Sequence, residues 1–324
     1  MAKKILVTGG AGYIGSHVVA KLGETGREII VVDNLSTGKK ENVLHGELKV
    51  FNLEETEKLE AILATGEIDA VIHFAGSIVV PESVSNPNKY YANNTINSAK
   101  IISLCNKHGV KKFVFSSTAA VYGIPPEQKV TEQSPTEPIN PYGRSKLMTE
   151  WMLKDAAFAH DFNFVALRYF NVAGADHKGR IGQSFPGATH LIKVSCEAAL
   201  GKRPSVAIFG TDFDTPDGSG VRDYIHVEDL AQAHLDALDY LDKHQKSHIL
   251  NCGYGKGYSV REVIKMVKKV SGVDFNAEEV GRRPGDPPAL ISEATKIREV
   301  LGWKPKYNDL EFIVKTAFEW EKKI

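Results

Sequence analysis

Short apolar runs recur along the first half of the chain and alternate with longer segments of mixed polarity. The runs lie at residues 5–7, 29–32, 48–51, 71–74, 113–115 and 164–167. Most of them show no alternation of apolar and polar residues, so they predict strands that are buried on both faces. Between the first two runs, Ile14, Val18 and Leu22 recur every four residues, which indicates one face of a helix. Strand and helix in turn predict an α/β fold, a Rossmann-type doubly wound parallel sheet.

This rhythm changes after Phe170. Gly, Pro, Asp and Thr crowd residues 174–188 and 210–220, and helical patterns return around residues 228–242 and 259–271. We therefore expect a second, smaller α/β domain, interleaved with the first because strand and helix signals resume near Ile225. The expected boundaries are residues 1–171 plus 226–251 for the Rossmann-type domain and residues 172–225 plus 252–324 for the smaller one.

Composition narrows the class of protein. The 324 residues are 42% hydrophobic and 25% charged, and the formal net charge is zero, so a nucleic-acid partner is not expected. We expect no membrane span, because no apolar stretch reaches about 18 residues. The first ten residues, MAKKILVTGG, lack the apolar run of a secretory signal.

The three cysteines point to a reducing compartment. Cys105, Cys196 and Cys252 lie far apart, form no CxxC pair and are odd in number. That spacing argues against a metal cage and against a disulfide framework. We therefore expect a cytoplasmic protein with no metal site.

A glycine-rich segment joins the first predicted strand to the first predicted helix. Gly9, Gly12 and Gly15 form GxxGxxG, and Gly10, Gly12 and Gly15 also form GxGxxG. Glycines allow the tight turn and let the backbone approach a pyrophosphate, to which the helix N-terminus presents N–H groups. A plain turn would explain glycines alone, but a position between strand and helix favours a dinucleotide site.

The acidic residue at the end of the second predicted strand selects the dinucleotide. Asp33 lies 18 residues after Gly15. A carboxylate there can accept hydrogen bonds from a ribose 2′-hydroxyl and would repel a 2′-phosphate, which favours NAD over NADP. The alternative is a solvated aspartate at a strand end.

Tyr142 and Lys146 form a YxxxK motif in the first turns of a predicted helix. Their i,i+4 spacing places both side chains on one face. A tyrosine with an ordinary pKa near 10 is a poor base at pH 7. We expect the lysine ammonium and a cationic nicotinamide to lower that pKa and so favour the phenolate.

A hydroxyl-rich segment follows directly after the predicted strand at 113–115. Ser116, Ser117 and Thr118 would lie at the carboxyl edge of the sheet, where ligands bind in doubly wound folds. We interpret Thr118 as the hydroxyl that hydrogen-bonds a substrate oxygen and relays its proton. A helix cap is the alternative, since Ser and Thr often serve that purpose.

From Ile5 to about Trp320 the chain resembles the UDP-hexose 4-epimerases of the extended short-chain dehydrogenase/reductase family. The motifs that carry the resemblance are the segments 7–16, 32–35, 73–76, 115–118, 140–146, 167–171, 221–227 and 282–286. In two places the sequence departs from the family pattern. Asn52 stands where an Asp near the adenine is usual, and Thr118 replaces the serine of some members.

The resemblance implies a set of contact residues. For NAD they are Gly9, Gly12, Tyr13, Ile14, Gly15, Asp33, Asn34, Leu35, Ser36, Thr37, Gly38, Asn52, Leu53, Phe74, Ala75, Gly76, Asn93, Ser116, Tyr142, Lys146 and Phe170. For the UDP-sugar substrate they are Thr118, Tyr142, Asn171, His190, Leu191, Ala207, Ile208, Phe209, Arg222, Arg283, Asp286 and Leu290.

The resemblance also implies the reaction. Tyr142 would take the proton of the sugar 4-hydroxyl, hydride would pass from C4 to NAD⁺, and the 4-keto sugar would turn over before hydride returns. Leu290 would leave room for an N-acetyl group, so UDP-GlcNAc and UDP-GalNAc are expected beside UDP-glucose and UDP-galactose. A homodimer is expected as well.

Two other functions compete with this one. A nucleotide-sugar 4,6-dehydratase places Asp-Glu after the active-site Thr, but Ala119 and Ala120 stand here and cannot transfer protons. A non-catalytic NAD-sensing protein would have no need of the Tyr/Lys pair.

Three histidines are candidates for acid–base catalysis. We expect His73 and His226 to pack in strands, because each lies in an apolar run, and the role of His190 stays open.

Overall fold

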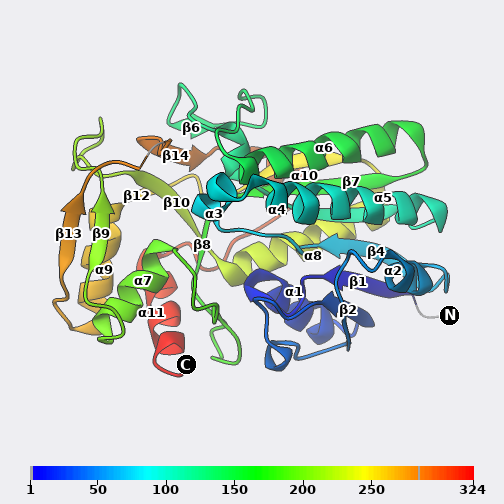
Figure 1. Cartoon of the computed structure of the whole chain (residues 1–324), viewed down its shortest axis with the longest axis horizontal. Helices are drawn as coiled ribbons and strands as arrows, with labels where there is room; N and C mark the ends of the chain where they lie inside the picture. Colours follow the sequence, from blue (N-terminus) through cyan, green and yellow to red (C-terminus); the bar gives the residue numbers. More distant parts are fainter. Residues whose placement is uncertain (1–2, 284) are drawn as a thin grey trace.

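A seven-stranded parallel sheet forms one half of the molecule (Figure 1). The computed structural model describes residues 3–283 and 285–324, so Pro284 of the motif at 282–286 lies outside the described residues. The strand order is β11-β7-β5-β4-β1-β2-β3, and every neighbouring pair is parallel. The strands are β1 (Lys4–Thr8), β2 (Ile29–Asp33), β3 (Glu47–Val50), β4 (Ile68–His73), β5 (Lys112–Thr118), β7 (Asn163–Tyr169) and β11 (His248–Cys252).

The apolar runs form these strands because both faces of the sheet are covered. Successive residues of one strand enter different clusters: Val7 packs on one face and Leu6 on the other. One face carries α1 (Tyr13–Glu24), α8 (Val227–His244) and α10 (Thr295–Leu301). The other carries α2 (Thr56–Leu63), α5 (Asn97–Lys107) and α6 (Pro141–Ala159). The edge strand β3 is the exception, since its residues are exposed or half-buried.

Smaller elements bridge the sheet and its helices on the α5 and α6 side. They are the 3₁₀ turn η3 (Ala119–Tyr122), the short helices α3 (Val80–Ser85) and α4 (Pro87–Tyr90), and a π-helical turn, η2 (Tyr91–Ile96). A further 3₁₀ turn, η1 (Lys40–Asn42), lies beside the β1–α1 turn, where Asn42 donates to the carbonyl oxygen of Ala11 (3.1 Å). The π turn lies directly before α5 and against α6, and such turns often occur at functional sites.

The second half is a mixed α/β unit beyond the carboxyl ends of the strands (Figure 1). Its sheet has the order β12-β10-β14-β6, with β8 beside β10, and β9 pairs with β13. The strands are β6 (Lys129–Val130), β8 (Asn171–Ala173), β9 (Val206–Phe209), β10 (Val221–His226), β12 (Gly257–Ser259), β13 (Ala277–Val280) and β14 (Ala289–Ser292). Its helices are α7 (Leu191–Ala199), α9 (Val260–Ser271) and α11 (Leu310–Glu321).

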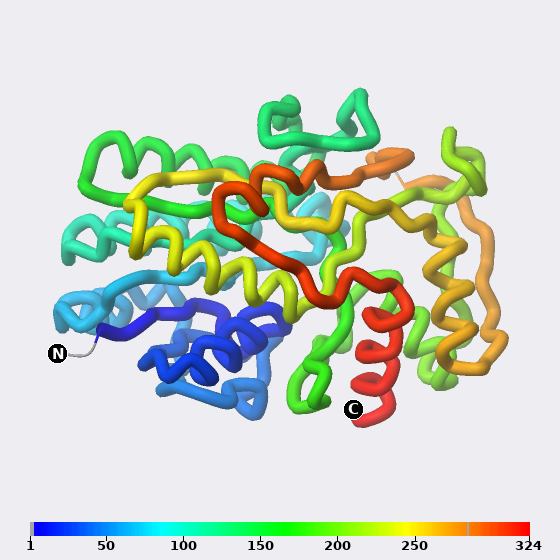
Figure 2. The backbone as a smooth tube through the Cα atoms, turned by 180° about the vertical axis from the view of Figure 1, so that it is seen from behind, coloured from blue at the N-terminus to red at the C-terminus, as the bar shows by residue number. Residues whose placement is uncertain are grey.

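The chain passes between the two halves more than once. After β10 the chain returns to the large sheet as α8 and β11, and Figure 2 shows the segment after α10 crossing the back of the molecule to α11. Asp229 of α8 fastens this segment by accepting hydrogen bonds from the N–H groups of Lys306 and Tyr307 (both 2.8 Å). β6 pairs with β14 across the expected boundary. The boundaries themselves stay a prediction.

The helices of residues 3–283 and 285–324 include none that is long and apolar enough to cross a membrane.

Candidate active site

A cavity of about 1150 Å³ opens at the carboxyl ends of the large sheet and extends to β10 and β14. It gathers most of the residues singled out in the sequence. From the cofactor set it is lined by Gly9, Gly12, Tyr13, Ile14, Gly15, Asp33, Asn34, Ser36, Thr37, Asn52, Leu53, Phe74, Ala75, Gly76, Asn93, Tyr142 and Phe170. From the substrate set it is lined by Thr118, Tyr142, Asn171, His190, Arg222, Asp286 and Leu290.

The glycine turn forms a bare backbone wall of this cavity. Gly9 has φ +73°, and a Cβ there would lie 2.6 Å from the backbone nitrogen of Ala75. A Cβ on Gly15 would overlap the carbonyl oxygen of Gly9. Gly12 precedes α1 as its N-cap without a side-chain cap among the described residues. The N-terminus of α1 thus faces the cavity without side chains in between, as a pyrophosphate site requires.

Asp33 ends β2 and holds the loops on either side of it. Its carboxylate accepts hydrogen bonds from the N–H groups of Ala11 (2.9 Å) and Leu35 (2.8 Å). Burial raises the pKa of Asp33, and these two hydrogen bonds offset part of that effect. Gly38 packs on Ala11, and neither Gly38 nor Leu35 lines the cavity. These two residues shape the loop instead.

Asn52 does reach the cavity. Its side-chain oxygen accepts a hydrogen bond from Asn34 Nδ2 (2.8 Å), so the two amides form one unit. A carboxylate would accept the same bond, but only the amide can also donate one.

Tyr142 and Lys146 lie in the first turns of α6, as predicted. Asn140 caps the helix by accepting the N–H of Gly143 (2.8 Å), and Pro141 occupies its first position. Tyr142 lines the cavity, whereas Lys146 lies beneath it and donates to the carbonyl oxygen of Ser116 (3.0 Å). Ser116 likewise lies behind the cavity wall.

In the protein alone, burial governs the pKa of Tyr142. Burial raises the pKa of the phenol, and hydrogen bonding with Thr118 lowers it only in part. Burial also lowers the pKa of Lys146 to about 8, since a buried ammonium has lost its hydration. The protein alone therefore does not lower the pKa of Tyr142, and the expected lowering beside a cationic nicotinamide stays a prediction.

Thr118 caps a helical turn and also faces the cavity, so its proposed catalytic role stays a prediction that the geometry allows. Its Oγ1 caps η3 by accepting the N–H of Ala120 (3.1 Å), and the same side chain lines the cavity beside Tyr142. A hydroxyl can accept one bond and donate another, so capping leaves its proton available.

His73 and His226 are structural, as expected. His73 is hydrogen-bonded to Thr8 Oγ1 (2.6 Å) and Ser98 Oγ (3.0 Å), and burial lowers its pKa to about 3. His226 caps α8 by accepting the N–H of Glu228 (3.2 Å). Both rings stay neutral at pH 7 and lie away from the cavity.

Two arginines and one carboxylate form a cationic group at the far end. Arg222 lies 3.6 Å from Asp286, and the Arg283 guanidinium stacks on the Phe209 ring at 3.5 Å. Burial lowers the pKa of both arginines; the charge of Asp286 opposes this shift, and that of Arg222 adds to it at Arg283. One carboxylate cannot neutralise two guanidinium groups, so this corner favours an anion.

The predicted substrate contacts on β9 point to opposite faces of the strand. Ala207 and Phe209 are half-buried on one face, whereas the side chain of Ile208 is buried in the core. Phe209 reaches the site through Arg283, and none of these four residues lines the cavity itself.

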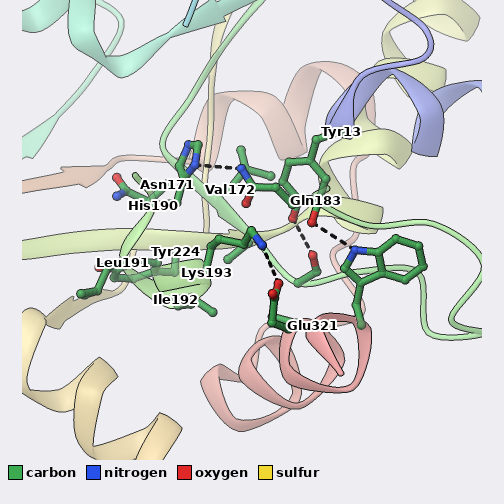
Figure 3. A pocket seen from close by; sticks show the side chains of 14 residues that line it. Tyr13, Asn171, Val172, Gln183, His190, Leu191, Ile192, Lys193, Tyr224 and Glu321 are labelled. Carbon is green, nitrogen blue, oxygen red and sulfur yellow. Dashed lines mark hydrogen bonds and ion pairs between the residues drawn. The ribbon is translucent and has the colours of Figure 1, made fainter. Parts of the chain in front are cut away.

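A smaller hollow of about 20 Å³ adjoins the main cavity, and His190 lies in its wall (Figure 3). His190 Nδ1 is hydrogen-bonded to Gln183 Nε2 (3.0 Å), and Trp320 of α11 donates to the Gln183 carbonyl (3.1 Å). Leu191 lines this hollow rather than the main cavity. Burial lowers the pKa of His190, which suits a neutral hydrogen-bonding role.

Several lining residues were missed in the sequence. Tyr169 lines the cavity, and its hydroxyl is hydrogen-bonded to Ser116 Oγ (2.7 Å). Its position one residue before Phe170 was a usable signal, because β7 ends at the same sheet edge. The segments 77–80 and 183–187 also contribute, but their sequences carry no chemical motif.

Comparisons with known proteins agree with this geometry. The model of the NAD dependent epimerase/dehydratase family matches residues 5–253. A UDP-glucose 4-epimerase from Azospirillum brasilense is 54% identical over 322 residues, 99% of this chain and 92% of the relative.

Two solved structures are similar over almost the whole chain. The UDP-Glc/GlcNAc 4-epimerase from Campylobacter jejuni is 52% identical with a TM-score of 0.88, covering 99% of this chain and all of that one. The UDP-glucose 4-epimerase from Bifidobacterium longum, in complex with NAD⁺ and UDP, is 38% identical with a TM-score of 0.94, covering 99% and 98%. The chain belongs to the NAD dependent epimerase/dehydratase family.

Proposed function

We propose that this protein is an NAD-dependent isomerase that interconverts UDP-glucose and UDP-galactose at C4. The observation that carries the proposal is the pairing of Tyr142 with Thr118 in one cavity that also holds a dinucleotide cradle and a cationic corner. The relatives named above support the same substrate class.

The cavity walls fit the nicotinamide dinucleotide. The bare turn at Gly9 and Gly15 leaves room for a pyrophosphate, and Asp33 faces the cavity from the end of β2. When bound, NAD⁺ supplies a hydride acceptor for C4 and, once reduced, the donor for its return.

The protein's own groups manage the proton. Tyr142 accepts the proton of the 4-hydroxyl, with Thr118 in the hydrogen-bond path. Because burial raises the pKa of Tyr142, the phenolate needs an additional positive charge, and the oxidised cofactor carries one. Lys146 holds the Ser116 carbonyl and so fixes the strand that carries Thr118.

Arg222 and Arg283 would hold the diphosphate. A guanidinium fork suits phosphate oxygens, and both groups are already partly stripped of water. Anchored there, the nucleotide can stay in place while a 4-keto sugar turns over and presents its other face.

The test is direct. Purified protein is incubated with UDP-glucose, and the sugars released by mild acid are separated by chromatography. Appearance of galactose supports the proposal; unchanged glucose, with NAD shown to be bound, contradicts it. Denaturing the protein and assaying the supernatant identifies the nucleotide, for which NAD and not NADP is expected.

We further propose that N-acetylated UDP-hexoses are substrates. Leu290 lines the cavity with only 9% of its surface exposed, and it packs with Phe170 and Leu147. An aromatic ring in place of Leu290 would crowd the substituent on C2 of the sugar, since overpacking a dense wall costs about 1–3 kcal/mol. Leu290→Tyr should depress kcat/KM for UDP-GlcNAc more than for UDP-glucose. Equal losses would contradict this assignment.

A homodimer is the assembly that we propose. Trp151 is 52% and Phe158 96% exposed, and their spacing of seven residues places them on one face of α6. Exposed aromatic pairs of this kind mark contact surfaces. Light scattering should give a dimer for the wild type and a monomer for Trp151→Asp; a dimer of Trp151→Asp would contradict this interface.

The cysteines support a reducing, cytoplasmic location as part of the same proposal. Cys105, Cys196 and Cys252 are all free and buried.

The alternative activities find less support. Ala119 and Ala120 line the cavity next to Thr118, where a dehydratase would need an acid and a base. An NAD sensor would not need a Tyr142 phenol in the cavity with Lys146 behind it.

A further inference from the structure

A third residue continues the face of α6 that bears Tyr142 and Lys146. Glu150 follows at the same four-residue spacing and is completely buried. A buried carboxylate needs hydrogen-bond donors or an opposite charge, because it has lost its hydration. Its partners therefore show what this position is built to hold.

Those partners are on the neighbouring strands β5 and β7, near their carboxyl ends. Glu150 Oε1 accepts bonds from Ser117 Oγ of β5 (2.6 Å) and Arg168 Nε of β7 (2.9 Å). Its Oε2 accepts the second arm of Arg168 (2.6 Å). Burial alone would lower the pKa of Arg168, but the bonds and the charge of Glu150 raise it, so the guanidinium keeps its charge.

Each contact lies one residue from a group that faces the cavity. Ser117 stands between Ser116, which Lys146 holds, and Thr118. Arg168 precedes Tyr169, and Ser117 and Arg168 are direct neighbours in the sheet. The two-pronged bond thus fixes α6, β5 and β7 relative to one another where Tyr142 must meet Thr118.

The remaining arm of Arg168 secures the segment beyond Thr118. Arg168 NH1 donates to the Tyr122 hydroxyl (3.0 Å), which donates to Asn251 Oδ1 (2.6 Å). Asn251 also donates to the carbonyl oxygen of Val130 (2.9 Å). Both ends of the segment from Ser117 to Tyr122 are therefore tied to the same guanidinium–carboxylate pair.

We propose that Glu150 and Arg168 are positioning residues for the reaction: they set the separation between the Tyr142 phenol and the Thr118 hydroxyl. The inference rests on the proposed function. Neither side chain lines the cavity, so both act through the residues that do. Removing the fork lets α6 shift against β5, and misplacement by about 1 Å can cost about a hundredfold in rate.

Three variants test this. Glu150→Gln keeps the shape but loses the charge, and Arg168→Lys keeps the charge but loses the fork. Both should lower kcat about 10- to 100-fold per folded, NAD-loaded molecule while KM changes little, and both should shift the pH profile of kcat, because the Tyr142–Thr118 hydrogen bond weakens. Asp229→Asn is the matched control: Asp229 is equally buried and accepts several hydrogen bonds, but its partners Tyr254, Lys306 and Tyr307 lie outside the cavity.

The outcomes are distinct. A wild-type kcat and pH profile in Glu150→Gln would overturn the proposal, and so would near-normal activity in Arg168→Lys. Either result would mean that Glu150 and Arg168 only balance each other's buried charge and do not position Tyr142 and Thr118. A wild type inert toward UDP-hexoses would overturn the proposed function instead. In that case a crystal structure of Glu150→Gln decides this inference: the Tyr142–Thr118 separation should grow by about 0.5 Å or more, and an unchanged separation would refute it.

Discussion

Tyr142 is the residue on which the proposed chemistry depends most directly. Tyr142→Phe removes only the hydroxyl, so the fold should survive while kcat falls about 10²- to 10⁴-fold. Because burial raises its pKa, kcat/KM of the wild type should rise with pH, and the variant should lose that rise. Steady-state rates from pH 6 to 10 measure both effects. Tyr90→Phe, which alters a neighbouring buried ring, is the control; activity of Tyr142→Phe close to wild type would rule out this base.

Lys146 has a measurable effect on stability. Its pKa is about 8 in the folded protein, against 10.5 for an ordinary lysine such as that of an unfolded chain. Below pH 8 both states carry the charge, and the fold bears the full cost of burying it. Between pH 8 and 10.5 the folded state loses the proton first, so the free energy of unfolding rises with pH.

Relative to Lys146→Met, the wild type should therefore gain up to about 3 kcal/mol over that range. Urea unfolding of both proteins at pH 7 to 10 gives the difference, with the exposed Lys315→Met as control. A constant difference would show that the ammonium is not desolvated in solution.

The sequence predicted the position of a residue best where neighbours in the chain determine its local structure. Gly9, Asp33 and Tyr142 were placed correctly, because the turn, the strand end and the helix start are each set by neighbours in the chain. The stacking of Arg283 on Phe209 could not be foreseen, since it joins residues 74 positions apart. The burial that raises the pKa of Tyr142 in the protein alone could not be foreseen either, because burial depends on the whole fold.

At the scale of elements, the β1–α1 turn gives the sharpest test of cofactor binding. Gly15→Ala would push a methyl group into the Gly9 carbonyl and open the turn. We expect the variant to be purified with little NAD and to unfold at a lower temperature. Gly281→Ala, at a glycine with open space and negative φ, is the control. Full NAD content in Gly15→Ala would show that the turn does not need this close approach.

Helix α11 supports the cavity from outside. Trp320 donates to the Gln183 carbonyl and packs on Gly182, where even a Cβ would lie 2.5 Å from the indole. Trp320→Ala should free the segment 183–187 and raise KM for the UDP-sugar several-fold, with a smaller change in kcat. Trp320→Phe keeps most of the packing, so its KM should lie between those of the wild type and Trp320→Ala. An unchanged KM in Trp320→Ala would separate α11 from substrate binding.

Elements with a clear period were predicted well, and short ones were not. All six apolar runs became strands of the large sheet, and the helical patterns at 228–242 and 259–271 became α8 and α9. The strand β6 has two residues and pairs with β14 far along the chain. Two residues carry no periodicity, so only tertiary contact can define such a strand.

For the whole molecule, the cavity joins both halves, so a ligand that contacts both should stabilise the fold as a unit. UDP at about 100 times its Kd should add about 2.7 kcal/mol to the free energy of unfolding and raise Tm. Uridine, which lacks the diphosphate, should add much less, and Arg222→Met should abolish the gain. Equal shifts with UDP and uridine would place the binding energy away from the arginines.

The order of strands in the large sheet also affects how the chain folds during its synthesis. β7 is the edge of the large sheet until β11 is added, and the roughly 80 residues between them include β8, α7, β9 and β10 of the second half. At about 5–20 residues per second, a ribosome needs several seconds to deliver them. Throughout that interval the nascent chain carries an open, apolar strand edge, the kind of surface on which unfinished chains aggregate. The burden on molecular chaperones thus falls during synthesis, before the last quarter of the polypeptide exists.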